Sequence, residues 1–135
     1  MAQPVLVDTD ILSAILRRDQ NALSRARQYL AEHRQFSLSI ITQYEILRGL
    51  KAKQATTQIG RFEELCRRSR VISVSQDVVE RASDLYADLR RQGNLIGDAD
   101  ILIAASALTQ GLGVATNNEG HFSRIPELHV ENWLT

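Results

Sequence analysis

Cysteine, proline and net charge are all scarce in this 135-residue chain. It contains one cysteine, two prolines and seven glycines, and its 16 basic residues balance 16 acidic ones. A single cysteine excludes an internal disulfide framework, so we expect a reducing, cytoplasmic location. So few prolines and glycines leave no room for a long flexible linker. We therefore expect one domain spanning residues 1–135.

Long apolar segments and surplus basic charge are also missing. The longest clearly apolar run, Ile101 to Ala105, is far too short to cross a bilayer. The opening segment 1–4 lacks the basic and apolar stretches of a signal peptide, so we expect no membrane association. Zero net charge argues against a protein that coats nucleic acid nonspecifically, because such binding needs an excess of basic charge. A nuclease is not excluded, since carboxylates in its site would offset basic residues around the rim.

Short β-prone segments alternate with helical ones along the chain. Strands are predicted at 5–7, 36–40, 71–74 and 113–116, with a fifth candidate at 128–130. Helices are predicted near 11–18, 21–30, 41–50, 53–69, 78–89 and 101–108, with Asn21 capping the second and Gly93 ending the fifth. The alternation predicts an α/β fold with a mainly parallel central sheet of four to five strands, flanked by helices on both faces.

Three acidic residues lie within or beside apolar segments. Asp8 follows the first predicted strand, Glu45 lies in the helix at 41–50, and Asp100 opens the apolar segment 100–105. Carboxylates beside apolar sequence lose water unless they gain hydrogen bonds or a cation. Three of them brought together would repel one another, and a divalent metal is the commonest remedy. In parallel sheets, sites form at the carboxyl ends of strands where the strand order reverses, a place that suits Asp8 and Thr116.

Two of these acids have structural explanations as well. Asp8 is suited to cap the following helix together with Thr9. Thr42-Gln43-Tyr44-Glu45 matches a capping box, in which Glu45 reaches back to the cap amide. On local sequence alone the capping box is the better explanation of Glu45. For Glu45 only the joint pattern with Asp8 and Asp100 favours a metal site, whereas the position of Asp8 at a strand end already favours metal binding.

Two further aspartates accompany the predicted set. Asp98 and Asp100 would point about 200° apart on one helix, so they are poor partners for a single ion. We expect Asp100 to be the ligand and Asp98 to be the helix cap, an outer-shell group or a ligand of a second metal. Asp10 is expected to face away from Asp8, and we leave it out of the catalytic set.

Other polar residues carry weaker signals. Thr116-Asn117-Asn118-Glu119 follows a strand and offers oxygens with little charge, although a plain polar turn explains it nearly as well. The three histidines have no metal-ligand spacing, and the basic clusters are typical of solvated helix faces. Cys66 is expected to be a small apolar helix residue.

The order and spacing of four segments carry a family resemblance across essentially the whole chain. They are 5–13 with Asp8, 42–50 with Glu45, 96–105 with Asp100, and a C-terminal group of Val114–Asn118, Phe122, Ile125 and Asn132-Trp133. Together they resemble the PIN-domain ribonucleases, and more closely the VapC-type toxins of type II toxin–antitoxin pairs. One position departs from the pattern. Many PIN domains carry a fourth acid two residues after the threonine, where this chain has Asn118.

The resemblance implies an endoribonuclease that uses Mg²⁺ or Mn²⁺ and inhibits translation. Asp8, Asp100 and, directly or through water, Glu45 would hold the ion, while Thr9, Thr116 and Asn118 would bind around the scissile phosphate. The substrate implied is single-stranded or looped RNA, with transfer RNA as one candidate. The resemblance also implies a cognate antitoxin protein as partner and a homodimer.

Two alternatives remain open from the sequence. Val7-Asp8-Thr9-Asp10 satisfies the D-x-D pattern of haloacid-dehalogenase-like phosphohydrolases, with Asp8 as nucleophile and Asp10 as acid. The later lysine of that family has no convincing counterpart here. The other alternative is a PIN-like domain that binds RNA or protein without catalysis.

Overall fold

The structure, a computed structural model, describes residues 2–135, so the first residue of the segment 1–4 lies outside it. The strands are β1 (Val5–Val7), β2 (Ser37–Ser39), β3 (Arg70–Ile72), β4 (Gly113–Ala115) and β5 (Val130–Glu131). The helices are α1 (Thr9–Leu16), α2 (Gln20–His33), α3 (Ile40–Ala52), α4 (Thr56–Arg67), α5 (Gln76–Arg91), α6 (Asp98–Thr109) and α7 (Glu119–Phe122). The predicted alternation is confirmed. Only the four-residue helix α7 has no counterpart among the predicted elements.

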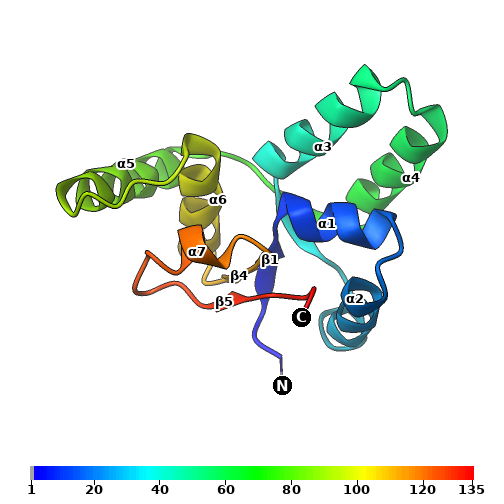
Figure 1. Ribbon diagram of the computed structural model, residues 1–135, viewed down its shortest axis with the longest axis horizontal. Coiled ribbons are helices and arrows are strands. Elements are labelled where there is room, and N and C mark those ends of the chain that lie inside the picture. The colour runs from blue at the N-terminus through cyan, green and yellow to red at the C-terminus, as the bar shows by residue number, and fades with distance from the viewer. Residues whose placement is uncertain (1) are drawn as a thin grey trace.

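The five strands form one parallel sheet in the order β3-β2-β1-β4-β5 (Figure 1). The chain moves outward from β1 to β3, then crosses back to add β4 and β5 on the other side. The strand order therefore reverses between β1 and β4, whose last residues, Val7 and Ala115, are paired in register. Asp8 and Thr116 follow these two strands, so both side chains begin at the switch point of the sheet.

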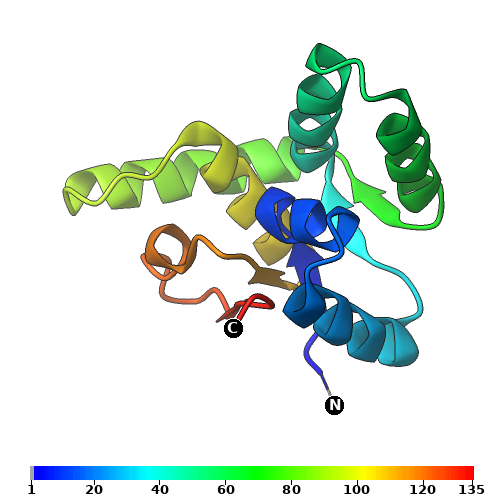
Figure 2. The ribbon, with the colours of Figure 1, turned by 45° about the vertical axis from the view of Figure 1, so that its right-hand side comes forward.

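Helices cover both faces of the sheet, as predicted. Along β1, Leu6 packs into one core with α5, α6 and α7, whereas Val5 and Val7 pack into the other with α1 to α4. This alternation follows from the two-residue repeat of a strand. Figures 1 and 2 both place α1–α4 on one side of the sheet and α5–α7 on the other. Residues 2–135 contain no helix with the length and apolar character that a bilayer crossing needs.

Helix α6 lies in the middle of the molecule. Its buried residues face several directions around the helix, as predicted: Ile101, Ile103, Ala104, Ala105, Ser106 and Ala107. A helix buried on nearly every side holds its first turn in a fixed position relative to the sheet. Asp100, the third residue of α6, is thereby fixed near the strand ends.

Three predicted helix starts need correction. Asp19, not Asn21, caps α2 by accepting a hydrogen bond from the backbone of Ala22. Helix α3 begins at Ile40 with Ser39 as its cap, so the capping-box interpretation of Glu45 is wrong. Gly97 occupies the cap position of α6, so the prediction of Asp98 as that cap is also wrong. At the far end of α5, Gly93 has φ +65°, which confirms its predicted role in ending that helix.

Candidate active site

Asp8 is the buried centre of the site, with only 5% of its surface exposed. Its Oδ1 accepts a 2.8 Å hydrogen bond from the Thr9 backbone, which caps α1. Its Oδ2 accepts a 2.8 Å hydrogen bond from the Thr116 hydroxyl, which comes from the neighbouring strand end. Asp8 is thus both helix cap and candidate ligand, and the two interpretations do not exclude each other.

The pKa of Asp8 rises to about 7. Burial is the largest cause, because it removes the water that stabilises a carboxylate, and the charge of Asp10 comes next. Hydrogen bonds from Thr116 and Thr9 act in the opposite direction, and Asp100 adds a smaller upward effect. The ionised form of Asp8 is therefore disfavoured, and among residues 2–135 no ion pair includes Asp8 or Asp10.

Asp10 lies among these acids, so the prediction that it faces away from Asp8 is wrong. Its Oδ2 accepts a 3.0 Å hydrogen bond from the Asn117 backbone. Its Oδ1 is sealed from solvent and has no hydrogen-bond partner. Burial raises the pKa of Asp10, and the charge of Asp100 raises it further. The D-x-D spacing at 8–10 is visible in the sequence. Only the structure shows that the side chain of Asp10 points toward the other acids, which makes Asp10 a candidate site residue.

Three consecutive residues after β4 each bind one of three acids. The Thr116 hydroxyl donates to Asp8, the Asn117 backbone donates to Asp10, and the Asn118 amide donates to Asp100 at 3.2 Å. The Thr116 hydroxyl also accepts a hydrogen bond from the Asn118 backbone, which orders this segment. We call Thr116–Asn118 the acid-binding segment. It joins Asp8 and Asp10, near the N-terminus, to Asp100 in α6.

His121 is the second partner of Asp100 and was not singled out by the sequence. Its Nδ1 lies 2.8 Å from Asp100 Oδ2. Nδ1 also lies 2.8 Å from the amide nitrogen of Asn118, so it donates to Asp100 in one tautomer and accepts from Asn118 in the other. Metal-ligand spacing was the wrong test for this histidine. The informative signal is its position three residues after Asn118, on α7.

Glu45 reaches the site from α3. The Thr9 hydroxyl donates a 2.6 Å hydrogen bond to Glu45 Oε1 and lies 3.2 Å from the hydroxyl of the buried Thr42. Thr9 directly follows Asp8 in the chain, so in space Thr9 lies between the carboxylates of Asp8 and Glu45. The structure thus places Asp8, Glu45 and Asp100 around the ends of β1 and β4, with Thr9, Thr116 and Asn118 between them.

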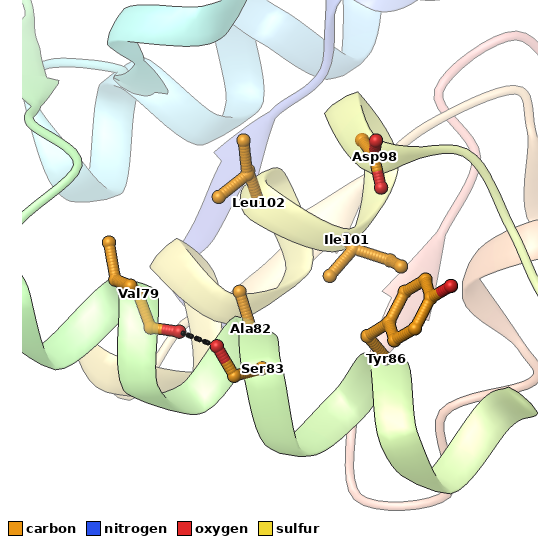
Figure 3. Close-up of a pocket in the computed structure, with 7 residues that line it drawn as sticks. All are labelled: Val79, Ala82, Ser83, Tyr86, Asp98, Ile101 and Leu102. Carbon is orange, nitrogen blue, oxygen red and sulfur yellow. Dashed lines mark hydrogen bonds between the residues drawn. The ribbon is translucent and has the colours of Figure 1, made fainter.

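Asp98 lies elsewhere. Its exposed side chain lines an apolar pocket of about 400 Å³ between α5 and α6, together with Tyr86, Ile101 and Leu102 (Figure 3). None of the hydrogen bonds described within residues 2–135 links it to Asp8, Asp10 or Asp100. The helical repeat explains the separation, because Asp98 and Asp100 project to different sides of the first turn of α6.

A groove of about 350 Å³ with both polar and apolar walls begins at Glu45. Thr9 and Glu45 form one part of its wall, and Arg17 and Lys53 form another. The remaining residues that line it are Ser13, Leu16, Ile46, Gly49, Leu50 and Gln58. The groove therefore runs between α1 and α3 toward α4 and places two cations within reach of a chain that passes the carboxylates.

The donor set suits a hard divalent cation, although it is no ready-made cage. Within residues 2–135, no group of three or more Asp, Glu, His or Cys side chains is placed to hold one ion together. Asp8, Glu45 and Asp100 each accept a hydrogen bond from a protein donor, and their joint binding of one ion stays a prediction. Mg²⁺ usually keeps several waters and takes one or two carboxylates, so it needs no such cage. The unpartnered Oδ1 of Asp10 is the kind of oxygen that a hydrated cation satisfies.

Comparison with known proteins gives the same assignment as the motifs. A family model for the PIN domain matches residues 5–128. Ribonuclease VapC2 of Haemophilus influenzae is 31% identical over 131 residues, which cover 96% of this chain and 97% of that protein. The tRNA(fMet)-specific endonuclease VapC of Salmonella typhimurium is 31% identical over 97 residues, which cover 71% of this chain and 74% of that protein.

Solved structures share the fold over nearly the full length. VapBC2 from Rickettsia felis, bound to a DNA fragment from its promoter, has a TM-score of 0.85 and 25% identity, covering 96% of this chain and 98% of that one. A toxin–antitoxin complex from Klebsiella pneumoniae has a TM-score of 0.73 and 27% identity, covering 93% and 95% of the two chains. These matches span the segments that carry Asp8, Glu45 and Asp100. The chain belongs to the PIN-domain family, among the VapC ribonucleases.

Proposed function

We propose that this protein is a divalent-metal-dependent endoribonuclease that acts as the toxin of a toxin–antitoxin pair. The observation that carries the proposal is the gathering of Asp8, Asp100 and Glu45 around the switch point of the sheet, joined by Thr9 and the acid-binding segment. Family membership supports the reaction class, since the relatives are ribonucleases by name. The PIN-domain match across residues 5–128 also removes the haloacid-dehalogenase alternative.

Mg²⁺ is the ion we propose, with Mn²⁺ as a substitute, because hard carboxylate oxygens are the ligands that both prefer. When bound, such an ion supplies a water of lowered pKa and neutralises charge that develops on the phosphate. Asp8 and Asp100 would hold it, and Glu45 would orient the attacking water. Thr9, Thr116 and Asn118 have hydroxyl and amide groups beside the carboxylates, and these groups would bind the phosphate oxygens of the substrate.

The groove beside Glu45 suggests how RNA enters. Arg17 and Lys53 lie on its wall, and phosphates are the anions that such side chains bind in nucleic acids. A single strand whose scissile phosphate lies at Asp8 and Asp100 would place a neighbouring phosphate near these cations. Unpaired RNA suits this geometry better than a duplex. The name of the Salmonella relative makes transfer RNA the first substrate to try.

A toxin of this kind needs an inhibitor that shields its site. The neighbouring structures include a toxin–antitoxin complex, which supports a cognate antitoxin as the partner of this chain. We further propose that the protein forms a homodimer and acts in the cytoplasm, as the resemblance of its motifs to VapC-type toxins implies.

The test is cleavage of RNA by the purified protein with Mg²⁺, Mn²⁺ or EDTA. Asp8→Ala and Asp100→Ala should reduce cleavage by at least a thousandfold while circular dichroism stays unchanged, because each removes a carboxylate on which the ion depends. Asp98→Ala is the matched control. It deletes the same side chain from the same helix turn as Asp100, but on the face toward α5, and should keep most of the activity.

Cleavage by the Asp8→Ala protein at the wild-type rate would show that this assignment is wrong. A wild-type protein that binds Mn²⁺ and RNA without cutting RNA would favour the non-catalytic alternative. Sequencing of cellular RNA ends after expression of the wild-type and Asp8→Ala proteins would then identify the substrate.

A further inference from the structure

Asp10 has no role in the function proposed above, yet it lies within the site. Its Oδ2 accepts one hydrogen bond, from the Asn117 backbone at 3.0 Å. Its Oδ1 is sealed from solvent and has no hydrogen-bond partner of normal geometry, although the backbone amides of Ile11 and of Asp10 itself lower the pKa of this carboxyl. Buried carboxylate oxygens normally have hydrogen-bond donors, because losing water without replacement costs free energy. This oxygen therefore calls for a functional explanation.

The charges around Asp10 increase that cost. Among residues 2–135, none of the ion pairs supplies Asp10 with a basic side chain. The charged groups that act on it are themselves acids, Asp8 from the end of β1 and Asp100 from α6. For folding alone, asparagine would serve better here, since its amide oxygen would keep the bond to Asn117 without adding a third negative charge.

The hydrogen bond from Asn117 ties Asp10 to the acid-binding segment. Thr116 and Asn118, on either side of Asn117, donate to Asp8 and Asp100. By accepting a hydrogen bond from the Asn117 backbone, Asp10 fixes the positions of Thr116 and Asn118 on either side. The far side of Asn117 is fixed as well, because its side-chain oxygen accepts a 3.0 Å hydrogen bond from the buried Asn132.

We propose that Asp10 is a positioning acid of the metal site, which raises the affinity for the divalent cation by adding a third negative charge beside Asp8 and Asp100 and by fixing Asn117 between their donors. It acts through these two carboxylates and not as a direct ligand, in keeping with the lack of a three-residue cage among residues 2–135. The inference rests on the proposed metal-dependent function. It also explains how the site holds its ion although position 118 is a neutral asparagine.

The experiment measures Mn²⁺ binding to the full-length protein by calorimetry, without RNA, so that no catalytic step enters. Asp10→Asn keeps an acceptor for Asn117 and removes only the charge. We expect its Mn²⁺ affinity to fall by about tenfold or more, the range found when outer-shell partners of metal ligands are changed. Asp98→Asn removes the same charge from a position outside the acid cluster and should change the affinity by less than about threefold, since exposed charges beyond the site are largely screened.

Thermal unfolding separates the charge from a purely structural role. Without metal, Asp10→Asn should melt at or above the wild-type temperature because repulsion is relieved, and Mn²⁺ should raise its melting temperature less than that of the wild type. A lower apo melting temperature with unchanged Mn²⁺ affinity would mean that Asp10 only supports the fold. The proposal is also overturned if only Asp10→Ala, which loses the bond to Asn117, weakens binding.

A second pair of variants covers the case in which Asp10→Asn does not fold. Asp10→Glu and Asp10→Gln have side chains of equal length that differ in charge, so the glutamate variant should bind Mn²⁺ more tightly by about the same factor. Equal affinities would contradict the role of charge. Wild-type protein that binds no Mn²⁺ at millimolar concentration would sink the proposed function itself, whereas wild-type binding with an unaffected Asp10→Asn sinks this inference alone.

Discussion

Asp8 shows how one side chain serves both the fold and the site. A helix cap needs an acceptor at the first turn, and a metal site needs an anion that water does not already satisfy. Asp8 meets both needs because β1 ends beside β4, which buries the carboxylate next to Thr116. This position is electrostatically unfavourable for ionised Asp8, because Asp10 and Asp100 lie nearby with like charge.

The raised pKa of Asp8 predicts an unusual pH dependence of the free energy of unfolding for the metal-free protein. The pKa of Asp8 is raised from 3.8 to about 7 in the folded state, so the folded protein holds its proton more tightly than the unfolded chain. The contribution of Asp8 to the free energy of unfolding is therefore fully present below about pH 4. It is lost as pH rises from about 4 to about 7. At 1.36 kcal/mol for each pH unit the loss is at most about 4 kcal/mol. Urea unfolding in EDTA at pH 4 and pH 8 measures it.

Asp8→Asn is the matched variant for this prediction, because it keeps the size of the side chain and cannot ionise. Its free energy of unfolding in EDTA should depend much less on pH between 5 and 8 than that of the wild type. Equal slopes for the two proteins would show that the pH dependence arises elsewhere. Adding Mg²⁺ should flatten the wild-type slope, since an ion stabilises the charged form.

Thr116 is the buried neutral partner of Asp8, and its hydroxyl is the part that matters. Thr116→Val preserves shape but leaves Asp8 Oδ2 and the Asn118 backbone without that hydroxyl. We expect a loss of about 1–3 kcal/mol in the free energy of unfolding, together with reduced RNA cleavage. Thr57→Val on the exposed face of α4 is the control and should be nearly neutral. A neutral Thr116→Val would mean that the hydroxyl does not order the site.

The same residues mark the limit of sequence reasoning about the site. Asp8, Glu45 and Asp100 were predicted because each borders apolar sequence and matches a family segment. Asp10 and His121 were not, because their importance depends on direction in space. One aspartate two residues after another points toward or away from it according to where the helix starts. A histidine on a four-residue helix reaches Asp100 only because α7 follows the acid-binding segment.

At the scale of single elements, β4 depends on a residue without a side chain. A Cβ at Gly113 would lie 2.7 Å from the ring of His129 and 2.8 Å from its backbone oxygen, where β5 approaches. Gly113→Ala should therefore push β5 from β4 and reduce the free energy of unfolding by about 1–3 kcal/mol. Since Thr116 follows β4, RNA cleavage should fall as well. Urea unfolding and cleavage assays measure both effects.

Gly60→Ala is the control for that substitution. Gly60 lies within α4 and has open space where a Cβ would stand. Alanine favours helix over glycine, so this variant should be stabilised by roughly 0.5–1 kcal/mol. Opposite changes in the free energy of unfolding for these two glycine-to-alanine variants would show that the close approach of β5 destabilises Gly113→Ala. A stabilised Gly113→Ala protein would contradict the close contact.

Elements were predicted better than their ends. Apolar residues recur at helical spacing in α5 and lie on nearly every side of α6, so both helices could be predicted from the sequence. The cap of α3 did not, because Ser39 and Thr42 both suit the cap position and only the three-residue length of β2 selects Ser39. That choice moves Glu45 from a capping role to a contact with Thr9.

At the scale of the whole molecule, zero net charge hides a division of charge. Acids gather at the switch point, while Arg17 and Lys53 stand along the adjoining groove. Replacing either cation with alanine should weaken RNA binding and reduce the salt slope of log K by about one for each phosphate that the variant no longer binds. Titration of RNA at several salt concentrations, in the Asp100→Ala background so that RNA stays intact, measures the slope.

Metal binding is the control for the groove variants. Arg17→Ala and Lys53→Ala should bind Mn²⁺ like the wild type, because these side chains line the groove and do not take part in the hydrogen bonds of the acids. If RNA affinity stays unchanged at every salt concentration, RNA follows another path to Asp8. A uniform loss of Mn²⁺ affinity would instead indicate that the groove and the acids are one site.

The sequence by itself determined the class of fold, the order of its elements and three of the acids. Hydrophobic periodicity and the residues that border it are local properties, which the chain carries before it folds. Tertiary structure alone decided which acids meet, because that depends on the parallel pairing of β1 with β4 and on burial of α6. These long-range contacts brought Asn117 to the carboxylate of Asp10, and Asn118 and His121 to that of Asp100.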